Sequence, residues 1–210
     1  MATTRPHDSA AVRRFRQERA QKHPRFATAV LADAQYASAC LGRPVADPTP
    51  LRLAYEALRL AVVSDAFAGL MLYRCKARLQ ALGVPLLPYV AHRLAIRWAG
   101  VSIGNPVLIE PGIYLPHGQV VIDGIVNIGH GTAIRPWVTI GLIEGNFQGP
   151  TIGANVRIGT GAKILGPVTL GDGAGIGANA VVLIDVPPGA TAVGVPARVS
   201  KRDDGPVDDG

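Results

Sequence analysis

The sequence predicts an α+β protein in which a small N-terminal helical bundle is followed by a solenoid of short strands. Two observations support this fold class. The composition changes near Gly100, because Ala, Leu and Arg dominate before this residue and Gly, Ile and Val dominate after it. From Ile103 onward the chain divides into six-residue units, and a repeat of this kind marks a solenoid. We therefore expect a helical domain over 1–100, a β-solenoid over 101–200 and an acidic flexible tail over 201–210.

Apolar residues recur at helical spacing through the first hundred residues. Breaks such as His23-Pro24, Asp47-Pro48-Thr49-Pro50 and Gly83-Val84-Pro85 separate the helices. The predicted helices span Ser9 to Gln21, Phe26 to Ala39, Leu51 to Val63, Asp65 to Leu82 and Leu87 to Trp98.

The six-residue units begin as IGNPVL, IEPGIY, LPHGQV and VIDGIV, after which we place one extra residue, Asn127. They continue as IGHGTA, IRPWVT, IGLIEG, NFQGPT, IGANVR, IGTGAK, ILGPVT, LGDGAG, IGANAV and VLIDVP. The first position is Ile, Leu or Val in thirteen of the fourteen units, and this side chain is expected to point inward. Only NFQGPT lacks it, which predicts a loop over roughly Leu142 to Thr151.

The composition excludes several classes of protein. Hydrophobic residues make up 48% and charged residues 17%, which excludes a disordered chain, and two cysteines exclude a disulfide scaffold. The chain has no apolar run of about 18 residues and no signal peptide, so we expect no membrane span and a cytoplasmic location. Residues 1–100 carry a net charge of +9 and residues 101–210 of −3. The basic arm over 1–25 has no aromatic residue except Phe15 among its charges, which makes nucleic-acid binding the weaker interpretation.

Five stretches resemble one enzyme family. They are LPHG (115–118), VTIG (138–141), IGTGAKILG (158–166), AVGVPARV (192–199) and the pair Tyr73-Arg74. The chain resembles the hexapeptide-repeat acyltransferases, and among them the serine acetyltransferases, over about Asp47 to Arg198. The resemblance implies a left-handed parallel β-helix with three hexads per coil, although the repeat by itself also permits a right-handed β-helix or a sandwich. It further implies acetyl-CoA or another acyl-CoA as co-substrate, and a homotrimer or hexamer.

The resemblance makes His117 the general base that takes a proton from the acceptor hydroxyl. An imidazole suits this task because it is neutral near pH 7 and still basic. The family orients this histidine with an upstream aspartate, and the matching position here is Ser102. His130 matches no catalytic position and is expected at the surface. Because no third histidine lies in the repeat region, we expect no metal site.

The coenzyme side of the site follows from the same resemblance. A backbone N–H near Gly141 or Leu142 is expected to face the thioester oxygen, which becomes negative in the transition state. The pantetheine arm is expected beside the small or polar residues Thr160, Gly161 and Ala178. The phosphates of CoA need cationic partners, for which Lys163 and Arg198 are the candidates.

The acceptor side departs from the family. An acid just before the histidine and an Arg-His pair in a later loop hold serine in the family, and these positions read Pro116, Gln148 and Gly149 here. Asp47 matches one further family acid, in a loose alignment. Asp123 or Glu110 could supply the missing charge. Aromatic residues could line a more apolar pocket, or pack between subunits instead; they are Trp137, Tyr114 and Phe147.

We therefore expect an acyl-CoA-dependent O-acetyltransferase that acts on a small-molecule hydroxyl, with serine predicted to be a poor acceptor. An amine, or the hydroxyl of a sugar or natural product, is the alternative acceptor. The alternative function is a non-catalytic oligomeric relative that serves as a scaffold or regulator. The retained His117 favours the enzyme, and the missing acids favour the scaffold.

Overall fold

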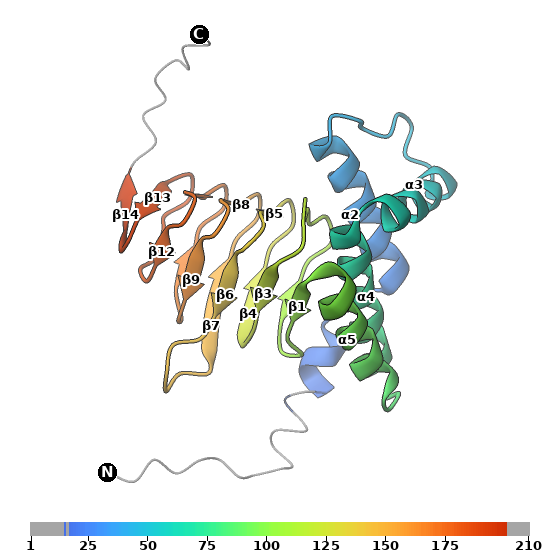
Figure 1. Ribbon diagram of the computed structural model, residues 1–210, viewed down its shortest axis with the longest axis horizontal. Coiled ribbons are helices and arrows are strands. Elements are labelled where there is room, and N and C mark those ends of the chain that lie inside the picture. Colours follow the sequence, from blue (N-terminus) through green and yellow to red (C-terminus); the bar gives the residue numbers. More distant parts are fainter. Residues whose placement is uncertain (1–14, 16, 201–210) are drawn as a thin grey trace.

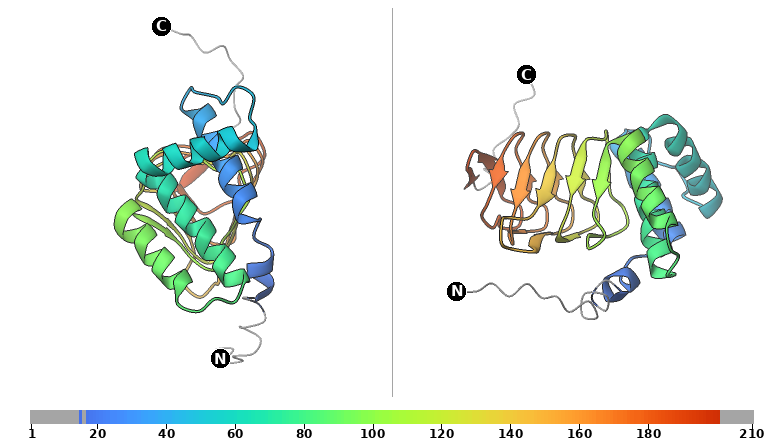
Figure 2. Two further views of the ribbon diagram at one scale, coloured as in Figure 1. Left: turned by 90° about the vertical axis from the view of Figure 1, so that its right-hand side faces the viewer. Right: turned by 60° about the horizontal axis from the view of Figure 1, so that its bottom comes forward.

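A layer of helices stands at one end of a β-helix in the computed structural model, which describes residues 15 and 17–200 (Figure 1). The helices are α2 (Phe26–Cys40), α3 (Pro50–Val63), α4 (Asp65–Ala81) and α5 (Leu87–Ala99). Two views at other angles show the same arrangement, with the helices covering the end of the β-helix that holds β1 (Val101–Ile103) (Figure 2). No helix in this part of the chain is long and apolar enough to cross a membrane.

Capping residues set the helix bounds close to those predicted from the sequence. The Thr49 side chain accepts a hydrogen bond from the Arg52 N–H at the start of α3, and Ser64 does the same for the Phe67 N–H in α4. Gly100 ends α5 in the left-handed conformation, at φ +62°. Residues 17–21 are helical, and the earlier part of the predicted first helix lies largely outside the described residues.

The strands form the three faces of a left-handed parallel β-helix. The first sheet contains β1, β3 (Val120–Ile122), β6 (Thr139–Gly141), β9 (Lys163–Leu165) and β12 (Val181–Val182). The second contains β2 (Leu108–Ile109), β4 (Ile125–Ile128), β7 (Gln148–Ile152) and β10 (Thr169–Leu170). The third contains β5 (Ala133–Ile134), β8 (Arg157–Ile158), β11 (Gly175–Ile176), β13 (Thr191–Gly194) and β14 (Ala197–Ser200). All pairs are parallel except β13 with β14.

The aliphatic residues of the repeat stack inside the β-helix, as predicted. The fully buried side chains include Ile103, Ile109, Ile122, Ile128, Ile134, Ile140, Ile158 and Ile164. Small residues such as Ala162, Ala174 and Ala180 fill the space between them and are also fully buried. The interior is therefore an apolar core that leaves only the corners and outer faces for chemistry.

The repeat frame differs from the predicted one in the second coil. Ile122 pairs with both Ile103 and Ile140, so 19 residues separate the first pair and 18 the second. Val121, predicted to point inward, is 45% exposed, whereas Ile122 is 1% exposed. The extra residue therefore lies in the corner before β3, where Gln119 adopts φ +64°, and not at Asn127.

The predicted loop is shorter than expected. Gln148 to Ile152 form β7, which pairs with β4 and β10, and Gly149 and Pro150 are buried. The part that leaves the coil spans only residues 142–147 and is closed by a bridge between Ile143 and Asn146. NFQGPT lacks the apolar first residue, but the backbone of its second half still forms the hydrogen bonds of the sheet.

A buried ion pair fastens the helices to the first coil. Arg74 Nε lies 2.9 Å from Asp33 Oδ2, and both side chains are almost fully buried. The Asp33 carboxylate also accepts hydrogen bonds from the N–H groups of Gly112 and Ile113, and Arg74 donates to the carbonyls of Ile109 and Glu110. The Tyr73 hydroxyl donates to the Val107 carbonyl at 2.9 Å. The Tyr73-Arg74 pair therefore docks α4 on the β-helix.

Replacing Arg74 with alanine should lower the free energy of unfolding by about 3–5 kcal/mol, because Asp33 would remain buried as an unpaired charge. Urea unfolding followed by circular dichroism measures this loss. Arg93→Ala is the matched control, since Arg93 is exposed on α5 and should cost less than about 0.5 kcal/mol. A loss below about 1 kcal/mol for Arg74→Ala would contradict the docking role.

His23 should make the folded state sensitive to acid. Burial, together with the nearby charges of Arg74, Lys76 and Arg19, lowers the pKa of His23 from 6.5 to about 4. The unfolded chain therefore takes up this proton first, and stability present above pH 6.5 is lost as the pH falls toward 4. Compared by urea unfolding at pH 7 and pH 4.5, His23→Gln should lose less stability than the wild type. An equal loss in both proteins would show that His23 does not contribute.

Candidate functional site

His117 lies in the corner that contains the extra residue, between the third and first sheets. Gly118 packs against the end of α5, where a Cβ would collide with the carbonyl oxygen of Ala99. Gln119 follows and adopts a positive φ. Its carbonyl accepts a hydrogen bond from the Trp137 N–H of the next coil at 2.8 Å. The inserted residue and the glycine therefore bring the corner against the helical layer and leave His117 exposed.

A cavity of about 660 Å³ lies between this corner and the helices. Pro116, His117 and Gln119 line it from the corner, and Tyr114 lines it from the same coil. The helical layer contributes apolar and charged residues, among them Leu41, Arg43, Arg59, Val63, Asp65 and Trp98. An exposed imidazole at the wall of such a cavity can take a proton from a bound hydroxyl group. Sequence reasoning missed Arg43, Arg59 and Asp65, because only the docking of the helices brings them to His117.

The predicted partner position of His117 does not reach the cavity. Ser102 lies on β1, pairs with Val121 of the next coil, and is absent from the residues that line the cavity. Within residues 17–200, no side chain donates a hydrogen bond to His117 or accepts one from it.

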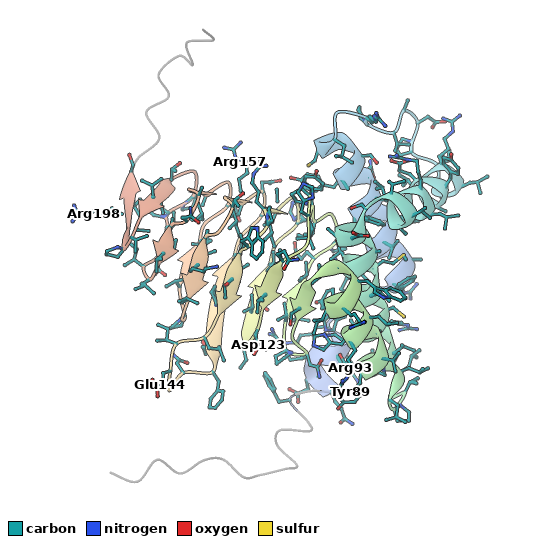
Figure 3. The ribbon with its side chains drawn as sticks, in the orientation of Figure 1. Tyr89, Arg93, Asp123, Glu144, Arg157 and Arg198 are labelled. Carbon is teal, nitrogen blue, oxygen red and sulfur yellow. The ribbon has the colours of Figure 1, made fainter. Side chains whose placement is uncertain are left out.

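Successive corners above His117 form one edge of the β-helix. The Gly161 N–H donates to the Pro136 carbonyl at 2.9 Å, and the Asn179 N–H donates to the Thr160 carbonyl at 2.8 Å. The edge therefore carries His117, Trp137, Thr160, Gly161 and Ala178 in consecutive coils. The Lys163 ammonium donates to the Trp137 carbonyl and to the Thr139 hydroxyl, at 2.7 and 3.1 Å. Arg198 lies on β14, at the end of the β-helix opposite the helices (Figure 3).

The remaining predicted residues lie on a different edge. Gly141 ends β6, Leu142 begins the loop, and Gln148 and Gly149 begin β7, so all four lie between the first and second sheets. Glu144 marks the tip of this loop in Figure 3. Since the strands of the first sheet separate this edge from His117, one chain does not bring the two groups of residues together. Phe147 belongs to the same loop and is also remote from the cavity.

The acidic residues considered as substitutes lie elsewhere. Glu110 Oε2 is 3.1 Å from His130 Nδ1, and both side chains are exposed at the third edge. Asp47 forms an exposed ion pair with Arg52 at 3.2 Å. Asp123 follows β3 at the edge near the loop. None of these acids lines the cavity. Within the described ranges, no group of three or more His, Cys, Asp or Glu residues could hold a metal ion.

Comparison with known proteins gives consistent similarities. The family model "Bacterial transferase hexapeptide (six repeats)" matches residues 149–183. A serine acetyltransferase of Helicobacter pylori is 38% identical over 139 residues, which cover 64% of this chain and 81% of that protein. One from Synechococcus elongatus is 34% identical over 71% of this chain and 62% of its own length.

Solved structures are similar over most of the chain. The serine acetyltransferase of Neisseria gonorrhoeae in complex with serine superposes with a TM-score of 0.70 at 30% identity, covering 93% of this chain and 78% of that one. A serine acetyltransferase in complex with CoA gives a TM-score of 0.70 at 28% identity, covering 91% of this chain and 76% of the other. Both the helical layer and the β-helix therefore have counterparts.

Proposed function

Because the chain belongs to the serine acetyltransferase-like hexapeptide-repeat acyltransferases, we propose that His117 is the general base of its acetyl transfer. The enzyme moves an acetyl group from acetyl-CoA to the hydroxyl of a small molecule. The observation that carries the assignment is the exposed His117 at the wall of the 660 Å³ cavity. The His117 imidazole takes the hydroxyl proton as the oxygen attacks the thioester carbonyl. The new C–O bond forms, the C–S bond breaks, and the proton passes to the departing sulfur.

Two chains complete one site in this proposal. His117 and Trp137 lie on one edge, whereas Gly141 and Leu142, the proposed donors to the thioester oxygen, lie on another. A threefold arrangement would place the first edge of one subunit against the second edge of its neighbour. We therefore propose a trimer as the catalytic unit, with Gln148 and Gly149 also reaching the site from the neighbour.

The coenzyme is proposed to follow the edge above His117. Thr160, Gly161 and Ala178 offer small side chains and backbone groups to the pantetheine arm. Arg198, at the far end of the same β-helix, is the proposed partner of a CoA phosphate (Figure 3). Lys163 is proposed to steady the edge as well as to add positive charge, because its ammonium already holds the Trp137 carbonyl.

Two trimers are proposed to pair through α3. Leu51, Tyr55, Leu58 and Val62 form one stripe along this helix, with exposed fractions between 67% and 81%. Spacings of four, three and four residues are those of a helix–helix seam. Figure 1 shows α3 on the side of the helical layer that faces away from the β-helix, where a second trimer would meet it. An apolar stripe of this length is costly in water unless another surface covers it.

Light scattering should therefore give about six times the 21.9 kDa chain mass for the wild type, and three times for Leu58→Asp. Burying the new carboxylate in the seam would cost several kcal/mol. Leu82→Asp is the control, since Leu82 is also exposed, at 59% against 67% for Leu58, but lies outside the stripe. A monomeric wild type at micromolar concentration would contradict the trimer, and a hexameric Leu58→Asp would contradict the role of α3.

The location proposed for this reaction is the cytoplasm. Both cysteines, Cys40 and Cys75, are free thiols, which supports a reducing compartment.

Thiol release from acetyl-CoA with a panel of hydroxyl acceptors tests the proposed function. We expect release that depends on an acceptor and on His117. The rival proposal, a non-catalytic scaffold or regulator, is supported by the missing partner of His117. Correct assembly without thiol release for any hydroxyl or amine acceptor would favour that rival.

A further inference from the structure

The charged residues of the His117 cavity come from three separate parts of the helical layer. Arg43 follows α2, Arg59 lies on α3 and Asp65 is the first residue of α4. They share the cavity with the proposed base, although nothing in the sequence places them near it. The charged side of the cavity therefore comes from the helical layer, and the side with His117 comes from a corner of the β-helix.

One of these charges is already neutralised. Arg59 donates from Nε and Nη2 to the two oxygens of Glu56, at 2.8 and 2.6 Å. Glu56 also accepts from the Ser38 hydroxyl at 2.5 Å, and the bonds from Arg59 lower the pKa of Glu56 to about 2. Because both oxygens of Glu56 accept hydrogen bonds from Arg59, this arginine forms part of the cavity wall and keeps little capacity to bind an ion.

Within residues 17–200, the other two charged side chains form no hydrogen bond or ion pair with another side chain, although the charge of Arg43 helps to lower the pKa of Glu56. Arg43 and Asp65 are both exposed and line the cavity together with apolar residues such as Leu41, Val63 and Trp98. Two arginines share the single carboxylate of Glu56, which leaves one net positive charge at the cavity, and Asp65 adds a negative one. Such a wall complements a molecule that carries both charges and an apolar body.

We propose that Asp65 binds the ammonium group and Arg43 the carboxylate of a hydroxy amino acid longer than serine, whose hydroxyl reaches His117. This inference rests on the proposed function, because it takes His117 as the base. Pro116 and Gly149 cannot bind the charged groups of the acceptor. Asp65 and Arg43 supply the complementary charges from the helical layer instead. Asp65 and Arg43 line the side of the cavity that the helical layer forms, and His117 lines the side that the corner forms, so the carbon chain of the acceptor must span the space between the two sides. The cavity of about 660 Å³ has room for such a body beside Val63 and Trp98.

The first arm of the test compares acceptors in the wild-type protein. We expect kcat/KM for homoserine or 5-hydroxynorvaline to exceed that for serine by at least about tenfold. The kcat/KM for the amino acid should also exceed the kcat/KM for its deaminated hydroxy acid and for its decarboxylated amino alcohol, by about 10–100-fold each. This is the usual effect of losing one hydrogen bond to a charged group.

The second arm uses variants and ratios of acceptors. Asp65→Asn should lower the ratio of kcat/KM between the amino acid and its deaminated analogue by about 10–100-fold. Arg43→Gln should lower the corresponding ratio against the amino alcohol by a similar factor. Arg93→Gln, exposed on α5 and outside the cavity, should change neither ratio (Figure 3). Thermal unfolding checks that each variant is folded.

The outcomes separate the two proposals. If an acceptor drives thiol release and both ratios stay unchanged in the variants, the cavity charges do not bind the acceptor and this inference is wrong. The same holds if the best acceptor has no charged groups. If no acceptor drives thiol release in the wild type, the proposed function itself fails. Ratio losses confined to the matching variant support the assignment of each charge.

Discussion

Replacing His117 with alanine should lower turnover by about 10²–10⁴-fold and leave the protein folded. An acceptor hydroxyl is a poor nucleophile while it keeps its proton, and His117 is the histidine that lines the cavity. Its side chain is exposed, so its removal leaves no hole in the core. Steady-state rates with saturating acetyl-CoA measure the loss, and the thermal unfolding temperature reports on the fold.

His130→Ala is the matched control for this experiment. His130 is also exposed, but it pairs with Glu110 on another edge of the β-helix and lies outside the cavity. We expect its removal to change turnover little. If the two variants behave alike, His117 is not the base.

Free serine should be a poor acceptor, with kcat/KM about 10²–10⁴-fold below that of an efficient enzyme. Its ammonium and carboxylate groups both need partners when they leave water. Pro116 offers no side-chain acceptor and Gln148 only a neutral amide. Gly149 offers no donor and cannot gain one, because a Cβ there would lie 2.6 Å from a methyl group of Val126. The packing of the Val126 side chain thus excludes a side chain at this position.

The measurement is kcat/KM for serine in the acetyl-CoA thiol-release assay. A value of about 10⁴ M⁻¹s⁻¹ or higher would contradict the prediction and show that other residues replaced the lost contacts. Pro116→Asp restores an acid beside His117 and should raise kcat/KM for serine. Pro116→Ala is its control, since it removes the ring without adding charge.

Each of the two errors in the predicted repeat frame has its own physical cause. All hexads follow the same pattern of residue types. The sequence therefore shows that one residue is extra, but not at which position of the coil it is inserted. Asn127 stays in β4, and the corner of His117 takes the insertion because Gln119 tolerates a positive φ there. The second half of NFQGPT remains a strand because its neighbours β4 and β10 supply hydrogen bonds regardless of the side chains.

The sequence by itself determined the features that depend on neighbours in the chain. Aliphatic residues at six-residue spacing specify the stacked core, and residues such as Thr49, Ser64 and Gly100 bound the helices. The motif around His117 predicts that this residue is the base. Only the tertiary structure decided which side chains meet across the molecule. It buries Arg74 against Asp33, keeps Ser102 out of the cavity lining, separates His117 and Gln148 onto two edges, and brings Asp65 and Arg43 to the cavity. These contacts depend on how the helical layer docks on the first coil, and the pattern of a local repeat does not specify that docking.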